Sequence, residues 1–277
     1  MEEKVQTKWI YYNHAMVPDI APHEIVETPK FDKKFWKNSG GGYPLFARWI
    51  SEFDCESETQ FWYIIRNAPY KTEDLSKSTR KHIRQALKKC YVREIEDNEV
   101  EKLYFCYQAA YKRYGQADNF RSFKSIKDEF FNRKKQNMFY YGAFELETNS
   151  LIGFFICTCH QEYLEINMSK FNPEYMSLRP SDALHDYVLN LWLNKPEIKY
   201  VSSGTRNLNH ETNVQEYKIN TFGFHKAYCK MHIQYRPCIY SIVKVLYVFR
   251  HLLKKLDGNK LIHAVNTVLQ MEEIARM

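Results

Sequence analysis

The order of apolar and polar positions predicts alternating helices and strands from about residue 76 onward. Apolar residues three and four positions apart mark one face of a helix, and short runs rich in β-branched and aromatic residues mark strands. The predicted helices cover 76–89, 97–114, a segment beginning at 122, 181–193 and 212–221. The predicted strands cover 91–95, 138–146, 151–159, 163–170, 198–202 and 226–235, with a hairpin turn at 148–150.

The two ends of the chain have different patterns. Residues 1–75 are extended and rich in loops, and after Pro237 the pattern predicts two amphipathic helices, 240–256 and 261–274. We therefore predict an N-terminal strand-rich region (1–75) that packs on the main domain, a central domain (76–238) and a C-terminal helical tail (239–277).

The central domain is predicted to be an α/β fold with a sheet of mixed direction. From residue 91 the order is β-α-α-β-β-β-α-β-α-β, and the three consecutive strands have no helices between them, which excludes a doubly wound sheet. Apolar residues make up 44% of the chain and charged residues 26%, as expected for a packed core.

Several classes of protein are excluded or disfavoured. No run of 18 uncharged apolar residues predicts a membrane span, and the first nine residues lack the apolar core of a signal peptide. The seven cysteines have no paired spacing, and the ten histidines have no metal-binding spacing. We expect a cytoplasmic protein with reduced thiols and without a metal.

The strand 163–170 alternates between polar and apolar residues. Strict alternation places Glu165, Asn167 and Ser169 on one face and Leu164, Ile166 and Met168 on the other. The polar face is either a surface exposed to water or a row of functional groups.

The formal charge of +7 is concentrated in one place. Residues 76–93 carry seven basic side chains and no acidic one, a patch suited to a phosphate-bearing ligand, RNA or an anionic lipid. The alternative is a solvated helix face, with Ile83 and Leu87 buried on the opposite side.

One loop and the element order together resemble the GNAT superfamily of acyl-CoA-dependent N-acyltransferases. Members often carry V-x-P-x-Y-R-G-x-G-x-G/A-x-A-L before their central helix, and residues 171–184 align with this motif without a gap. Pro173, Tyr175, Ala183 and Leu184 match, and Ser181 stands for the last small residue. Residues 217–224 look like the family's closing helix and its Gly-Phe turn.

The resemblance implies a GNAT-like mixed sheet flanked by helices, acetyl-CoA or another acyl-CoA as co-substrate, and a set of site residues. Glu165 corresponds to the catalytic base of some members, and main-chain N–H groups near 168–171 would bind the thioester oxygen. The implied cofactor-binding residues are Phe171, Arg179, Ser181, Asp182 and Asn213. Ser181 is expected to cap the helix whose start binds the pyrophosphate.

Two departures from the family pattern bear on catalysis. Arg179 replaces a glycine that lets the backbone approach the pyrophosphate. The tyrosine that often protonates the leaving thiolate falls at Ile219, so Tyr217, two positions earlier and on a different helix face, is the candidate replacement.

Three functions stay open at this point. The first is transfer of an acyl group from acyl-CoA to an amine or hydroxyl of a small molecule or cell-envelope precursor. The basic helix and Tyr217-Lys218 before Phe222-Gly223 also resemble the FemAB-like branch, whose aminoacyl transferases use charged tRNA, although we expect no nucleic acid partner. The third is a degenerate, non-catalytic binding module. The basic and apolar tail 240–270 suits a peripheral membrane contact, or packing on its own domain or on a second copy.

Overall fold

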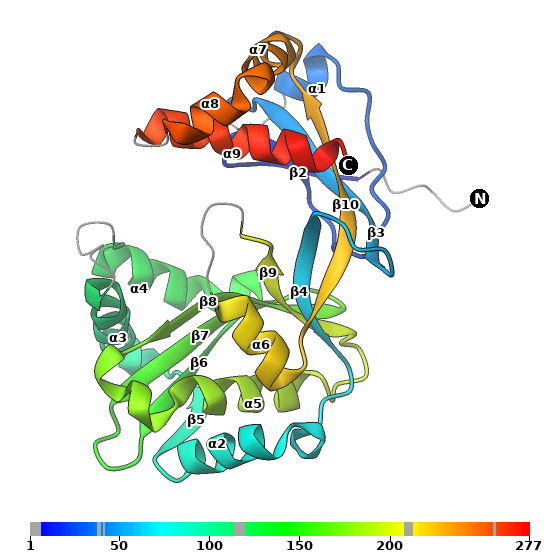
Figure 1. The fold of residues 1–277 in the computed structure, drawn as a ribbon. Coiled ribbons are helices and arrows are strands. Elements are labelled where there is room, and N and C mark those ends of the chain that lie inside the picture. Colours follow the sequence, from blue (N-terminus) through cyan, green and yellow to red (C-terminus); the bar gives the residue numbers. More distant parts are fainter. Residues whose placement is uncertain (1–6, 38–39, 41, 114–119, 208–212, 257–258) are drawn as a thin grey trace. The chain divides into compact units, whose positions relative to one another are not determined.

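The computed structural model describes residues 7–37, 40, 42–113, 120–207, 213–256 and 259–277 (Figure 1). The chain forms two compact units. Unit 1 consists of Met1–Tyr63, Thr205–Thr212 and Lys226–Met277, and unit 2 of Ile64–Gly204 and Asn213–His225. The predicted division into 1–75, 76–238 and 239–277 concerns consecutive segments and stays a prediction.

Unit 2 has the predicted order of helices and strands. Its strands are β5 (Cys90–Glu94), β6 (Met138–Glu145), β7 (Leu151–Cys159), β8 (Tyr163–Phe171) and β9 (Tyr200–Thr205), which ends at the unit boundary. Its helices are α2 (Lys77–Leu87), α3 (Val100–Arg113), α4 (Phe123–Asn132), α5 (Pro180–Trp192) and α6 (Val214–Phe222). The strand order is β9-β8-β7-β6-β5, in which β8 and β9 run parallel and the other pairs antiparallel. The mixed sheet flanked by helices confirms the predicted fold class.

Helices cover both faces of this sheet. Phe154 and Ile156 of β7 face the apolar cluster beneath α3 and α4, whereas Phe155 faces His185 of α5. Helix α2 packs against α5. Because both faces are buried, the sheet strands are largely apolar throughout, and alternation along them is weak.

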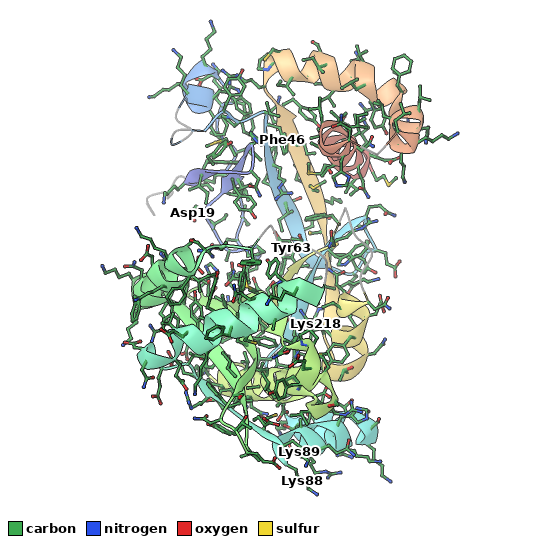
Figure 2. All side chains as sticks on the ribbon, turned by 90° about the vertical axis from the view of Figure 1, so that its left-hand side faces the viewer. Asp19, Phe46, Tyr63, Lys88, Lys89 and Lys218 are labelled. Carbon is green, nitrogen blue, oxygen red and sulfur yellow. The ribbon has the colours of Figure 1, made fainter. Side chains whose placement is uncertain are left out.

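The basic face of α2 is solvated. Ser76 caps the helix, and Ile83 and Ala86 are buried beneath it. Lys88 and Lys89, at its C-terminal end, extend away from the ribbon (Figure 2). Leu87 was expected to be buried with Ile83, but it is 48% exposed, because the buried face follows Thr79, Ile83 and Ala86 instead.

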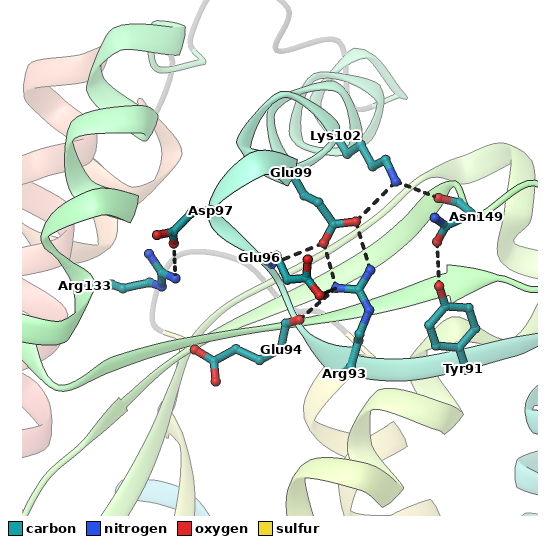
Figure 3. A network of polar contacts seen from close by, with 9 residues as sticks. All are labelled: Tyr91, Arg93, Glu94, Glu96, Asp97, Glu99, Lys102, Arg133 and Asn149. Atoms are coloured by element: carbon teal, nitrogen blue, oxygen red, sulfur yellow. Dashed lines mark hydrogen bonds and ion pairs between the residues drawn. The ribbon is translucent and has the colours of Figure 1, made fainter.

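An ion-pair network joins β5 to the start of α3 (Figure 3). Arg93 forms two bonds to the carboxylate of Glu99, with N–O distances of 2.6 and 2.9 Å, and Lys102 approaches the same carboxylate at 3.2 Å. The helix predicted to begin at 97 begins at Val100 instead, because a 3-10 turn at Asp97–Glu99 precedes it, and Glu96 with Glu99 forms the capping box. The carboxylate of Glu99 thus serves both the cap and the ion pair.

Unit 1 contains a second group of strands covered by C-terminal helices. Its elements are β1 (Trp9–Tyr12), β2 (Ala15–Pro18), α1 (Lys33–Lys37), β3 (Phe46–Cys55), β10 (His225–Tyr235), which starts at the unit boundary, α7 (Pro237–Val248), α8 (Arg250–Lys255) and α9 (Lys260–Ala275). Strand β4 (Phe61–Asn67) begins in unit 1 and ends in unit 2. Phe46, Met231, Val243 and Leu269 belong to the core of unit 1.

The tail has three helices rather than the predicted two. Phe249 lies between α7 and α8 with φ −94° and ψ 9°, outside helical geometry, so the predicted helix 240–256 is interrupted there. The predicted break at 257–259 falls largely outside the described residues, although Asn259 is described and caps α9. None of the described helices is long and apolar enough to cross a membrane.

Candidate active site

The sheet of unit 2 opens between β8 and β9. The two parallel strands pair only from Tyr163 to Glu165 on β8 and from Tyr200 to Ser202 on β9. Strand β8 then continues along β7 as far as Phe171. No described strand pairs with the β9 side of β8 beyond Glu165, so the two strands diverge from that residue onward.

A bulge at Asn167 lies at the beginning of this opening. Ile166 pairs with Cys157 and Met168 with Ile156, so Asn167 is an extra residue in β8. The side chain of Asn167 accepts a hydrogen bond of 2.7 Å from Thr158. The resemblance implied donors near 168–171, and the bulge begins one residue earlier.

The bulge corrects the predicted faces of β8. Directly paired residues share a face, so Glu165, opposite Thr158, lies with Met168, which is opposite Ile156. Ser169 is opposite Phe155 and lies on the other face. The prediction that Glu165, Asn167 and Ser169 form one polar row is therefore wrong, because one inserted residue reverses the alternation beyond it.

Glu165 is a half-buried carboxylate on the α3 side of the sheet. Its Oε2 lies 3.6 Å from Nε2 of His160, whose ring stacks on Tyr163 at 4.4 Å. Its main chain is part of the last β8–β9 pair, directly before the opening. The position suits a base that takes a proton from an acceptor lying in the opening.

The start of α5 differs from the predicted capping arrangement. Arg179, with φ 60°, is the N-cap and Pro180 is the first helical residue, so Ser181 does not cap the helix. Arg179 closes the preceding turn by donating its N–H to Met176, and the fixed φ of Pro180 favours the first position. The hydroxyl of Ser181 instead lies 3.3 Å from Nδ1 of His185.

Three predicted site residues meet at this helix start. The carboxylate of Asp182, 4% exposed, accepts a hydrogen bond of 2.5 Å from the hydroxyl of Tyr217 and lies 3.5 Å from the guanidinium of Arg179. Burial and the neighbouring carboxylate raise the pKa of Tyr217 far above its ordinary value. Tyr217 therefore stays protonated, and its proton is directed toward Asp182.

The other two predicted cofactor-binding residues lie apart from this group. Phe171 is the last residue of β8, and its ring contacts Phe155 edge-on at 6.1 Å between centroids. Asn213 precedes α6 as its N-cap but makes no capping hydrogen bond through its side chain. The main-chain oxygen of Asn213 accepts a hydrogen bond of 2.9 Å from the N–H of Tyr217, but its side chain takes no part in the contact between Tyr217 and Asp182.

Sequence reasoning missed the most unusual group of the site, a buried lysine on α6. Lys218 is 6% exposed, and its ammonium group donates a hydrogen bond to the hydroxyl of Ser203, directly after the last residue of β9 that pairs with β8. Burial lowers the pKa of Lys218 to about 8. Among the residues that the structure describes, no carboxylate pairs with this buried cation.

Two neutral groups surround this lysine. Burial, and then the charge of Lys218, lower the pKa of His185 to about 3, so the imidazole is neutral. Its Nδ1 donates to the main-chain oxygen of Ser181 at 2.8 Å, which leaves Nε2 as a buried acceptor without a partner. Burial raises the pKa of Cys157, so its thiol stays protonated beside Lys218.

Packing fixes the orientation of His185. Its ring stacks on Phe222 of α6 at 4.7 Å and meets Phe155 of β7 edge-on at the same distance. Lys218 and Phe222 are four residues apart on α6 and both are buried. The spacing of four residues between Lys218 and Phe222 was the one signal in the sequence, and by itself it does not separate a buried lysine from a solvated one.

Comparisons with known proteins agree with this arrangement of strands and helices. No protein-family model matches the chain, and no curated protein matches it. The structure of FemX is similar over 70% of this chain and 72% of its own, with 6% identity and a TM-score of 0.52. The chain has a GNAT-like fold. The likeness to FemX shows the fold alone.

Two further solved structures match less of the chain. An aminoglycoside 6′-N-acetyltransferase from Acinetobacter baumannii matches 50% of this chain and 92% of its own, with 11% identity and a TM-score of 0.40. The PaiA N-acetyltransferase from Thermoplasma acidophilum, in complex with coenzyme A, matches 37% of this chain and 72% of its own, with 14% identity and a TM-score of 0.29.

Proposed function

We propose that the chain is an acyltransferase that moves an acyl group from an acyl-CoA thioester to an amine or hydroxyl acceptor. The observation that carries the proposal is the buried, unpaired Lys218 at the opening between β8 and β9. Acyl transfer develops negative charge first on the carbonyl oxygen and then on the leaving sulfur. A buried cation that no carboxylate of the described residues neutralises is suited to both.

In the proposed reaction, Glu165 acts from the α3 side of the sheet and Lys218 from the α5 side. Glu165 takes the proton that an ammonium acceptor must lose before its nitrogen attacks the carbonyl carbon. The carbon–sulfur bond then breaks, and Lys218, with a pKa of about 8, returns a proton to the sulfur. Tyr217 is bound to Asp182, so in this proposal it positions the start of α5 rather than donating to the substrate.

The start of α5 offers limited support for the predicted pyrophosphate site. Arg179 supplies a positive charge there, but Pro180 has no N–H group and the carboxylate of Asp182 repels an anion. Phe171, Ser181 and Asn213 are included in the proposal as cofactor-binding residues. The acceptor proposed is a small molecule or a cell-envelope precursor.

A second candidate is transfer of an aminoacyl group from charged tRNA. It is favoured by the likeness to FemX and by the exposed basic side chains of α2, of which Lys77, Lys81 and Lys88 have no ion pair among the described residues. An aminoacyl ester develops the same charge on its carbonyl oxygen, so the Lys218 site suits either donor. The donor therefore distinguishes the two functions.

The deciding experiment is a thermal-shift series with acetyl-CoA, longer acyl-CoAs and tRNA. A ligand that binds only the native state raises the melting temperature, by an amount that grows with its concentration. We expect an acyl-CoA to raise it and tRNA to have no effect at physiological salt. A tRNA shift that disappears with added salt and with Lys77, Lys81 and Lys88 replaced by Gln would favour the aminoacyl transferase. No shift with any donor would favour the non-catalytic binding module.

A further inference from the structure

Helices α7 and α8 are apolar on both sides. Their inward side chains pack on the core of unit 1: Val243 is buried, and Ile239, Leu246 and Leu253 are partly buried against it. An ordinary amphipathic helix would turn polar residues outward from this position. These two helices instead carry a second set of apolar side chains on the opposite side.

We call this second set, with the basic residues among it, the outer face. Val248 is 71% exposed, Phe249 52% and Leu252 59%. The apolar members of the outer face are Tyr240, Ile242, Val245, Val248, Phe249, Leu252 and Leu256, and its basic members are Lys244, His251, Lys254 and Lys255. Contiguous exposed apolar groups of this kind mark an interaction surface.

The charge of the outer face identifies its partner. No Asp or Glu occurs from residue 217 to residue 256. Lys244, Lys254 and Lys255 have no ion pair among the described residues, whereas Arg250 is turned inward toward Glu273 of α9 at 3.7 Å. The apolar row is therefore bordered by positive charge that nothing in the described part of the chain neutralises.

Two partners could cover an apolar face, and the charge separates them. A second copy of this chain would bring the lysines of both copies together across a shared axis, with no acidic residue on the face to offset them. An anionic lipid surface offers negative headgroups for the lysines and an acyl boundary for Phe249 and its apolar neighbours. We propose that the outer face of α7 and α8 docks the protein flat on an anionic membrane surface.

This docking is independent of the proposed acyl transfer and is tested by sedimentation with lipid vesicles. The full-length protein should sediment with vesicles containing phosphatidylglycerol, and much less with vesicles of phosphatidylcholine alone. Raising the salt should release part of it, because screening weakens the lysine contribution. Phe249→Glu combined with Leu252→Glu should weaken binding at least tenfold.

Matched variants test whether the face itself is responsible. Replacing Lys244, Lys254 and Lys255 by Gln should weaken binding roughly a hundredfold, the product of three surface charges. Replacing Lys77, Lys81 and Lys88 of α2 by Gln removes the same charge and should change binding less than threefold. Phe105→Glu, on an exposed phenylalanine of α3, is the control for the apolar change.

Two results would overturn the proposal. One is an equal loss of vesicle binding in the α2 and α7–α8 lysine variants. Vesicle binding would then depend on the net charge of the protein and not on the outer face. The other is a stable dimer in analytical ultracentrifugation that Phe249→Glu dissociates, which would assign the outer face to self-association. Circular dichroism and melting temperature of each variant establish that a loss is not unfolding.

Discussion

Two charged sites inside unit 2 show opposite solutions to the burial of charge. At the start of α3, Glu99 is 2.6 Å from Arg93 and 3.2 Å from Lys102, and it also accepts the main-chain N–H of Glu96. At the β8–β9 opening, the hydroxyl of Ser203 is the one hydrogen-bond acceptor of Lys218 among the described residues, and the thiol of Cys157 lies nearby. The charge of Glu99 is compensated by neighbouring cations, whereas the charge of Lys218 has no compensating carboxylate among the described residues.

The pKa values express the same difference. The hydrogen bonds from Arg93 lower the pKa of Glu99 to about 2, because its charged form is stabilised. Burial lowers the pKa of Lys218 to about 8, because its charged form is destabilised. A fully paired buried charge supports the fold, and an unpaired one costs stability that a function must justify.

Glu165 is half-buried and has one ionisable neighbour, His160, at 3.6 Å, so it lies between the two sites in burial and in pairing. Its replacement should have the largest effect of the changes considered, a loss of turnover. We expect Glu165→Gln to keep the fold and donor binding but to lower turnover by roughly 10²–10⁴-fold, the range for a positioned proton acceptor. Turnover equal to that of the parent would make Glu165 an ordinary surface residue of β8.

Breaking the complete site should destabilise the protein. Glu99→Gln should lower the free energy of unfolding by roughly 2–3 kcal/mol, below the cost for a fully buried pair because Arg93 keeps some access to water. The parent itself should lose this stabilisation as the pH falls from about 4.5 toward 2, where Glu99 is protonated in the folded state. Urea unfolding at pH 7 and pH 3 measures both; an unchanged midpoint for Glu99→Gln would contradict the account.

At Lys218 stability should also rise with pH, but in an alkaline range and because burial destabilises the charged form. Its pKa is lowered from 10.5 to about 8, so between these values the unfolded chain holds a proton that the folded chain has released. The parent should therefore gain about 3 kcal/mol relative to Lys218→Met as the pH rises from 7 to 10.5. If the free energy of unfolding changed with pH in the same way in the parent and in Lys218→Met, Lys218 would not be a buried cation.

Solvated charges should have the smallest effect. Replacing Lys77, Lys81 and Lys88 by Gln should change the free energy of unfolding by no more than about 0.5 kcal/mol, since these side chains are exposed and have no ion pair among the described residues. A larger loss would show that α2 takes part in a charge network, and it would weaken the contrast with Lys218.

The sequence was sufficient to predict the order of elements in unit 2, because local periodicity and turn residues define them. It was insufficient for the bulge in β8. Ile166 and Met168 are two residues apart and suggest a single apolar face, yet they lie on opposite faces. Helices cover both faces of this sheet, so an apolar side chain is buried on either face. The pattern of apolar residues in β8 therefore does not reveal that Asn167 is an extra residue.

Lys218 was missed for a related reason. A lysine beside Tyr217 on a short helix is usually solvated, and its burial depends on β7, β9 and α5, which come from distant parts of the chain. The start of α5 was misjudged because Arg179 adopts a left-handed conformation that a glycine or asparagine more often supplies. In both places tertiary packing overrides the local preference.

The most direct test of the central claim compares turnover and melting temperature in Lys218→Met, with the donor identified by thermal shift. The account predicts a loss of turnover of roughly 10²–10³-fold, as when a group that stabilises transition-state charge is removed. It also predicts a melting temperature at pH 7 equal to or above that of the parent, since the buried cation is gone. Turnover like that of the parent, or a loss matched by a lower melting temperature, would contradict it.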